Sequence, residues 1–90
     1  MPMRAQVLIS GKVQGVFFRS FIRSRAALLN VRGWTRNTQE GAVEAALEGE
    51  KEDIEKVIAA CREGPTGAMV TDVKVEWTEP NDGFEGFEIR

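Results

Sequence analysis

Residues 31–48 read VRGWTRNTQEGAVEAALE, and this central stretch decides the fold. Residues 31–37 and 42–48 are two short extended segments. In the second, successive side chains would alternate between the two faces of a strand. Between them, Thr-Gln-Glu-Gly at residues 38–41 predicts a turn in which Gly41 is free to take a positive φ. The middle of the chain is therefore predicted to be a β-hairpin.

A strand and a helix are predicted before this hairpin. Residues 4–10 alternate as a strand does, and Leu8 makes the second face apolar as well, which is typical of a central strand. Apolar side chains then recur at helical spacing from Phe18 to about Asn30. Asn30 suits the left-handed conformation that often ends a helix, so the helix is expected to stop there.

A helix and two strands are predicted after the hairpin. The helix starts among acidic residues, which the helix dipole favours at that end, and its apolar stripe runs to Cys61. The pair Gly64-Pro65 ends it, and an alternating strand follows over residues 73–77. A turn at residues 80–83 leads to a last short strand at residues 87–89.

The order of these elements is β-α-β-β-α-β with a terminal extension. That order predicts the ferredoxin-like split βαβ plan (βαββαβ), an α+β fold in which two helices pack on one face of a twisted antiparallel sheet. With 90 residues, of which 42% are hydrophobic, the chain can build one core between the two layers. We therefore expect a single domain over residues 1–90.

Composition narrows the chemistry that this domain can perform. The chain has no histidine and one cysteine, so it lacks the commonest general base and the commonest transition-metal ligand. The single thiol cannot form an intramolecular disulfide, which favours a cytoplasmic location. A net charge of -2 argues against nucleic acid or anionic lipid as a partner. We expect no secretory signal, membrane span or cofactor, and nothing demands more than a monomer.

The segment between the first strand and the first helix, residues 11–19, reads GKVQGVFFR. Glycines let such a loop curl so that N–H groups converge at the helix N-terminus, and Arg19 adds a guanidinium suited to phosphate oxygens. A cation there opposes the helix dipole, at a cost of about a few tenths of a kcal/mol unless an anion joins it. A tight β-α connection with a solvated Arg19 fits the same residues. The spacing alone leaves both interpretations open, although Val13 after Lys12 rules out a Walker loop.

Two stretches of the sequence resemble the signatures of the acylphosphatase family. Residues 11–19 are similar to the first signature, and Gly33-Trp34-Thr35-Arg36-Asn37, continued by Gly41, Val43 and Gly49, is similar to the second. The order and spacing of the two match, and the likeness extends over essentially the whole chain. The resemblance implies an enzyme that hydrolyses a small acyl phosphate without a metal or cofactor.

The resemblance also implies which residues perform the reaction. It implies that the phosphate is held by a run of backbone amides, those of Gln14, Gly15, Val16, Phe17 and Phe18. The Arg19 side chain would share this role, and Asn37 would position the attacking water. Two positions depart from the family pattern: Asn30 stands where glycine is usual, and Thr35 where a small apolar residue is usual. Neither is a proposed catalytic group, so they concern the helix end and local packing.

The chemistry of these residues suits an activated substrate. The amide of Asn37 can accept a hydrogen bond from water and donate one to phosphate, although an asparagine that caps the turn fits the same position. A carboxylate is a good leaving group, so an acyl phosphate needs no general acid, and its own phosphate can take the proton of the water. A stable alcohol phosphate would instead demand a metal, a histidine or a cysteine nucleophile.

Other reactive side chains have simpler interpretations. Cys61 falls on the apolar stripe of the second helix, where thiols are inert packing groups. A group of acidic residues could suggest a divalent-metal site: Glu44, Glu48, Glu50, Glu52 and Asp53. A solvated strand face and a helix N-terminus explain them better, so no metal is expected. Trp34 and Trp77 are interpreted as packing residues.

The alternative function is a non-enzymatic ferredoxin-like module that binds a small ligand or regulates another protein, because this fold hosts many functions. An RNA-binding version should carry aromatic side chains on its central strands. Residues 42–48 have none and carry two glutamates, Glu44 and Glu48, which argues against RNA. The presence of both Arg19 and Asn37 favours the enzyme.

Overall fold

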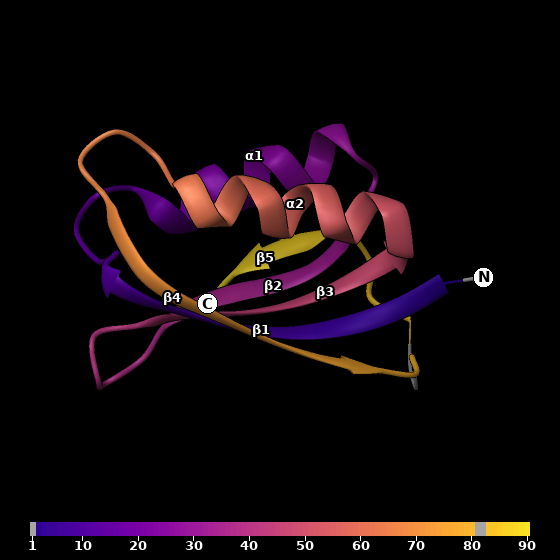
Figure 1. Ribbon diagram of the computed structural model, residues 1–90. Helices are drawn as coiled ribbons and strands as arrows, with labels where there is room; N and C mark the ends of the chain where they lie inside the picture. The colour runs from indigo at the N-terminus through magenta and orange to yellow at the C-terminus, as the bar shows by residue number, and fades with distance from the viewer. Residues whose placement is uncertain (1, 81–82) are drawn as a thin grey trace.

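The computed structural model describes residues 2–80 and 83–90, so the predicted turn at residues 80–83 lies partly outside the described residues. Along the chain the elements are β1 Pro2–Lys12, α1 Phe18–Leu28, β2 Arg32–Asn37, β3 Val43–Glu50, α2 Lys51–Glu63, β4 Met69–Thr78 and β5 Phe87–Ile89. Both helices lie on one face of the sheet (Figure 1). Within the described residues, neither helix is long and apolar enough to cross a membrane.

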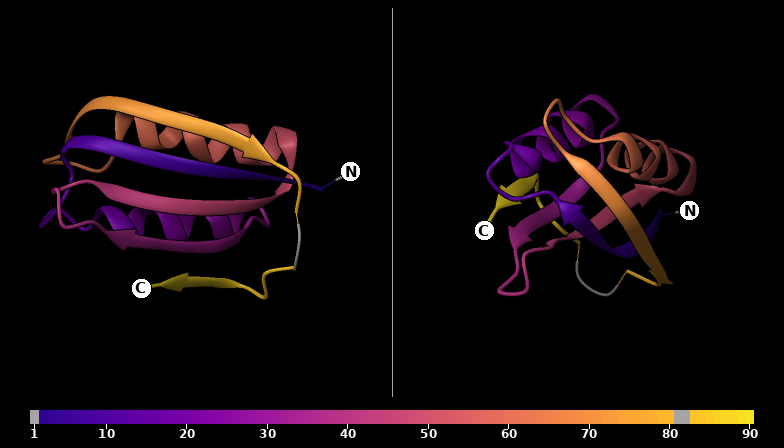
Figure 2. Two further views of the ribbon diagram at one scale, coloured as in Figure 1. Left: turned by 90° about the horizontal axis from the view of Figure 1, so that it is seen from below. Right: turned by 60° about the vertical axis from the view of Figure 1, so that its left-hand side comes forward.

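The sheet has the strand order β4-β1-β3-β2-β5. Strand β1 is central, with antiparallel β3 on one side and antiparallel β4 on the other, and β3 pairs antiparallel with β2. These four strands and the two helices confirm the predicted ferredoxin-like plan. Strand β5 adds to the free edge of β2 in parallel, at the opposite edge of the sheet from β4 (Figure 2). The complete sheet is therefore mixed, whereas its four-stranded part is antiparallel as predicted.

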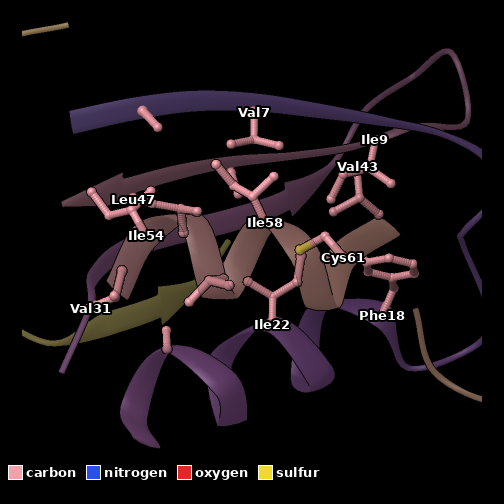
Figure 3. Close-up of a cluster of buried hydrophobic side chains, with 14 of the residues drawn as sticks. Val7, Ile9, Phe18, Ile22, Val31, Val43, Leu47, Ile54, Ile58 and Cys61 are labelled. Carbon is pink, nitrogen blue, oxygen red and sulfur yellow. The ribbon is translucent and has the colours of Figure 1, made fainter. Parts of the chain in front are cut away.

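The core lies between the helices and the sheet, as the apolar spacing predicts. Helix α1 buries Phe18, Ile22 and Ala26, and α2 buries Ile54, Val57, Ile58 and Cys61. Figure 3 shows side chains from both helices facing Val7, Ile9, Val43 and Leu47 of the sheet. Burying one large apolar side chain stabilises the fold by about 1.5–3 kcal/mol, so these periodic positions hold the two layers together.

Local signals also placed the ends of the elements. Asn30 takes a left-handed conformation with φ 56 just after α1, as expected of a residue that ends a helix. The hairpin closes through Thr38, whose N–H donates to the carbonyl of Ala42 at 2.9 Å, and Gly41 has φ 90. The buried hydroxyl of Thr35 donates to the carbonyl of Glu44 at 3.1 Å. The departures at Asn30 and Thr35 are thus both accommodated.

The interpretation of Glu48 as part of a solvated strand face is wrong. Its side chain is only 2% exposed, and its carboxylate lies 3.1 Å from the Arg4 guanidinium and 3.7 Å from that of Arg32. The backbone N–H of Phe84 donates to the same carboxylate at 3.1 Å. The Arg4 guanidinium also lies 4.2 Å from the centre of the Phe84 ring. The segment that precedes β5 therefore covers this end of the outer face.

Candidate active site

The loop of residues 13–17, which joins β1 to the N-terminus of α1, has an unusual backbone. Gly15 has φ 75 and Phe17 has φ 63, two left-handed residues within three positions. Glycine adopts this conformation freely, but for phenylalanine it is uncommon, and strained residues of this kind cluster at active sites and ligand clamps. Val13 and Phe18 are 1% and 2% exposed, so both ends of the loop are anchored in the core.

The amides of this segment are free for a ligand. Among the described residues, no protein acceptor is found for the N–H groups of residues 14–20, and the first helical bond of α1 is from Phe21 to the carbonyl of Phe17, at 3.0 Å. The first turn of α1 has no acidic side chain, and its N-cap makes no side-chain hydrogen bond. Unpaired amides and the positive end of the helix dipole together attract an anion.

Arg19 lies in the first turn of α1 and lines a pocket together with Gly15 and Phe17. Its Nη1 donates to the backbone carbonyl of Arg90 at 3.4 Å, a long hydrogen bond. Within residues 2–80 and 83–90, no Asp or Glu side chain forms an ion pair with Arg19. No acidic side chain offsets its positive charge, which adds to that of the helix terminus.

Asn37 is the last residue of β2 and pairs with Val43 across the hairpin. It lies on the same face as the buried Thr35, which is the face that carries the helices, as the alternation predicts. Its side chain is partly exposed and makes no hydrogen bond to any described residue. The amide of Asn37 is therefore not committed to capping the turn.

One pocket of about 320 Å³ brings these groups together, lined by Val13, Gly15, Phe17, Phe18, Arg19, Ser20, Asn37 and Ile89. The β1–α1 loop and the β2–β3 turn lie at the same end of the sheet, which is why residues distant in sequence meet there (Figures 1 and 2). Of the predicted phosphate-binding residues, Gly15, Phe17, Phe18 and Arg19 line the pocket. Gln14 and Val16 do not line it.

Those two side chains point elsewhere. Gln14 hydrogen-bonds the β2–β3 turn, and Val16 packs against the core. A backbone role for either residue stays a prediction. Val13, Ser20 and Ile89 also line the pocket, and none of the three is a predicted site residue. Ser20 follows Arg19 at the helix N-terminus, a position that could have suggested it, whereas Ile89 arrives only through the pairing of β5 with β2.

The other candidate groups do not form a second reactive centre. Cys61 is buried in the core, and burial raises the pKa of its thiol to about 12, so it is no nucleophile at neutral pH. Among the described residues, no group of three or more Cys, Asp or Glu side chains is arranged to hold a metal ion. The Arg90 guanidinium lies 4.8 Å from the centre of the Trp34 ring, and Lys51 lies 5.5 Å from that of Trp77. Trp77 packs against the core, as predicted, whereas a packing role for Trp34 stays a prediction.

Comparisons with known proteins identify the family of this chain. The family model described as Acylphosphatase matches residues 5–89. An acylphosphatase from Pelotomaculum thermopropionicum is 49% identical over 96% of this chain and 94% of its own length. The structure of an acylphosphatase from Coxiella burnetii has a TM-score of 0.93 at 37% identity and covers 99% of this chain and 93% of its own.

A crystal structure of acylphosphatase from Bacillus subtilis has a TM-score of 0.95 at 30% identity, with 98% of both chains covered. These matches run nearly from end to end of the chain and include both signature segments. They confirm the resemblance found in the sequence and the class of enzyme that it implies. The chain belongs to the acylphosphatase family.

Proposed function

We propose that this chain hydrolyses the carboxyl–phosphate bond of acyl phosphates to a carboxylate and inorganic phosphate. The observation that carries the proposal is the shared pocket, which is lined by the N-terminal turn of α1 with Arg19 and by Asn37, whose amide is uncommitted. The first two groups suit a dianionic phosphate. The third suits a water molecule beside it.

In the proposed mechanism the phosphate binds against the loop amides of residues 14–18, and the Arg19 guanidinium neutralises its charge. The Asn37 carbonyl accepts a hydrogen bond from a water and holds it in line with the bond to be broken. The water oxygen attacks phosphorus, the bond from phosphorus to the carboxyl oxygen breaks, and both electrons leave with the carboxylate. A phosphate oxygen takes the proton of the water, so no side chain has to act as a general base.

The same reasoning sets the substrate class. The pocket residues include no histidine, cysteine or carboxylate that could protonate an alkoxide leaving group. A carboxylate leaves without protonation, so acyl phosphates are substrates and alkyl phosphates are not. We further propose that residues 1–90 form a single domain and that the protein is cytoplasmic. Cell fractionation tests the location.

The test is a spectrophotometric assay with benzoyl phosphate, run beside p-nitrophenyl phosphate and repeated with EDTA. We expect loss of benzoyl phosphate, a much slower reaction of the aryl ester, because a phenolate is a poorer leaving group than a carboxylate, and no effect of the chelator. A rate for benzoyl phosphate that does not exceed the blank would contradict the proposal and favour the non-enzymatic ligand-binding module. Loss of activity with EDTA would contradict the metal-free mechanism alone.

A further inference from the structure

The side chain of Gln14 leaves the β1–α1 loop and bonds to the hairpin instead. Its Nε2 donates to the backbone carbonyl of Thr38 at 2.9 Å and to that of Ala42 at 2.9 Å. Both partners are carbonyl oxygens, which only accept, so the amide must present its NH2 group to them. Both N–H groups of the side-chain amide therefore donate to the backbone of the β2–β3 turn.

The two acceptors lie where the turn that follows Asn37 begins and ends. Thr38 is the next residue in the chain, and its N–H donates to the carbonyl of Ala42 at 2.9 Å. The N–H of Ala42 donates in turn to the Thr38 hydroxyl at 3.1 Å. Gln14 thus binds the two backbone carbonyls that close the hairpin beside the pocket. A shift of this backbone would carry the Asn37 side chain with it.

No other polar side chain performs this task in the described part of the chain. Within residues 2–80 and 83–90, Gln14 makes the only side-chain hydrogen bonds between residues 13–17 and the β2–β3 hairpin. Val13 and Phe18 anchor the loop in the core through apolar contacts, which are not directional, whereas a hydrogen bond prefers a defined distance and angle. The Asn37 amide makes no hydrogen bond of its own to a described residue, so its place is set by its backbone.

We propose that Gln14 is a positioning residue, which fixes the distance between the phosphate-binding loop and the amide that orients the water. This role rests on the function proposed above. The loop holds the phosphorus and Asn37 holds the nucleophile, so an error in their separation misaligns the attack while leaving phosphate binding intact. A misplacement of about 1 Å can cost about 100-fold in rate.

The test begins with Gln14→Met, which keeps the length of the side chain but donates no hydrogen bond. For benzoyl phosphate we expect kcat to fall about 10- to 100-fold, while the inhibition constant of inorganic phosphate changes by less than about threefold. The matched control is Gln6→Met: Gln6 lies on β1 outside the pocket and donates to Glu44 at 3.2 Å. The control should keep the parent kcat. An equal kcat in both variants, or a loss confined to phosphate binding, would overturn the role.

A double-mutant cycle separates positioning from a general loosening of the site. If Gln14 acts through Asn37, then Gln14→Met added to Asn37→Ala should lower kcat no further. Losses that multiply in the double variant would overturn the inference. A parent protein without activity, or an Asn37→Ala variant at the parent rate, would instead contradict the proposed function, so the two failures are distinguishable.

A readout independent of activity completes the test. Amide hydrogen exchange at Thr38 should be faster in Gln14→Met than in the parent and unchanged in Gln6→Met, because the lost bonds close the turn at that residue. If Gln14→Met does not fold, Gln14→Asn takes its place, since a side chain shorter by one methylene cannot reach both carbonyls. Unchanged exchange at Thr38 in the folded variant would overturn the proposal.

Discussion

Arg19 and Asn37 line one pocket although they come from different elements, the first turn of α1 and the last residue of β2. Arg19 shares the pocket with the unpaired amides of the helix N-terminus, and Asn37 enters from the sheet beside them. The positive charge of the pocket lining is thus on the α1 side, and the neutral amide of Asn37 is on the side of the sheet. This division separates binding of phosphate from placement of water, so the placement of water can be removed while phosphate binding is kept.

Replacing Arg19 should remove binding and turnover together. In Arg19→Ala we expect kcat/KM for benzoyl phosphate to fall by about 100-fold or more, because charge stabilisation in such a site is usually the largest single contribution. Inhibition by inorganic phosphate should weaken in parallel. Arg19→Lys keeps the charge but loses the planar fork, so it should recover only part of the activity.

The matched control for this prediction is Arg23→Ala. Arg23 lies one turn further along α1, is exposed and does not line the pocket. Its removal changes the net charge by the same amount, so it corrects for long-range electrostatics. Activity in Arg19→Ala equal to that of Arg23→Ala would contradict the proposed role.

Replacing Asn37 should lower turnover and spare binding. Asn37→Ala removes the acceptor for water but no positive charge, so kcat should fall steeply, by about 100-fold, while the phosphate inhibition constant stays within about threefold of the parent. Asn37→Asp places a carboxylate beside the phosphate, so binding should weaken as well. Steady-state kinetics with phosphate as inhibitor measure both effects. Gln39→Ala, in the exposed turn, serves as the control, and a similar kcat in the two alanine variants would contradict the assignment.

The hairpin and the helices could be predicted from the sequence because each is encoded by neighbouring residues. The apolar spacing of Ile54, Val57, Ile58 and Cys61 shows which face of α2 is buried, and the structure buries all four. Asn30 and Gly41 likewise mark a helix end and a turn through their own backbone preferences. From such local signals the order of the four antiparallel strands and two helices could be predicted. That order places Arg19 and Asn37 at the same end of the sheet.

Features that depend on distant segments could not be predicted in this way. Glu48 alternates with Leu47 as an exposed residue would, and only the segment at Phe84 makes its position a buried one. The parallel pairing of β5 with β2, which brings Ile89 to the pocket, depends on where the chain returns to the sheet. The side-chain hydrogen bonds of Gln14 join residues 24 and 28 positions apart in the sequence, and no local pattern predicts them.

The ion pairs of Glu48 should be important for stability and not for catalysis. Glu48→Ala removes one ion-pair partner of the partly exposed Arg4 and the acceptor of the Phe84 amide, so the free energy of unfolding should fall by about 1–3 kcal/mol. Glu48→Gln keeps the shape and one acceptor and should cost less. Urea unfolding measures both, with the exposed Glu52→Ala as control. Glu48 does not line the pocket, so kcat of the folded variants should match the parent. Equal stability of the Glu48→Ala and Glu52→Ala variants would contradict the prediction.

Cys61 should contribute to stability in a way that depends on pH. Burial raises the pKa of its thiol in the folded protein to about 12, whereas the pKa of the thiol in the unfolded chain is about 8.5. Above that pH only the unfolded state loses the proton, which favours unfolding. The contribution of the thiol is therefore complete below about pH 8.5 and is lost as the pH rises toward 12, by about 1.4 kcal/mol for each pH unit.

Comparison with Cys61→Ala isolates this effect, since the other groups titrate alike in both proteins. Near pH 7.5 the parent should be more stable by about 1 kcal/mol, because alanine leaves a small void among the core residues. Urea unfolding at pH 7.5 and pH 10 should show this advantage shrinking or reversing, while thiol reagents label the native parent at pH 7.5 only after urea is added. A stability difference that is the same at both pH values would show that the thiol ionises as readily in the core as in water. Full activity of Cys61→Ala at pH 7.5 is expected as well, because the thiol lies outside the pocket and no step of the hydrolysis uses it.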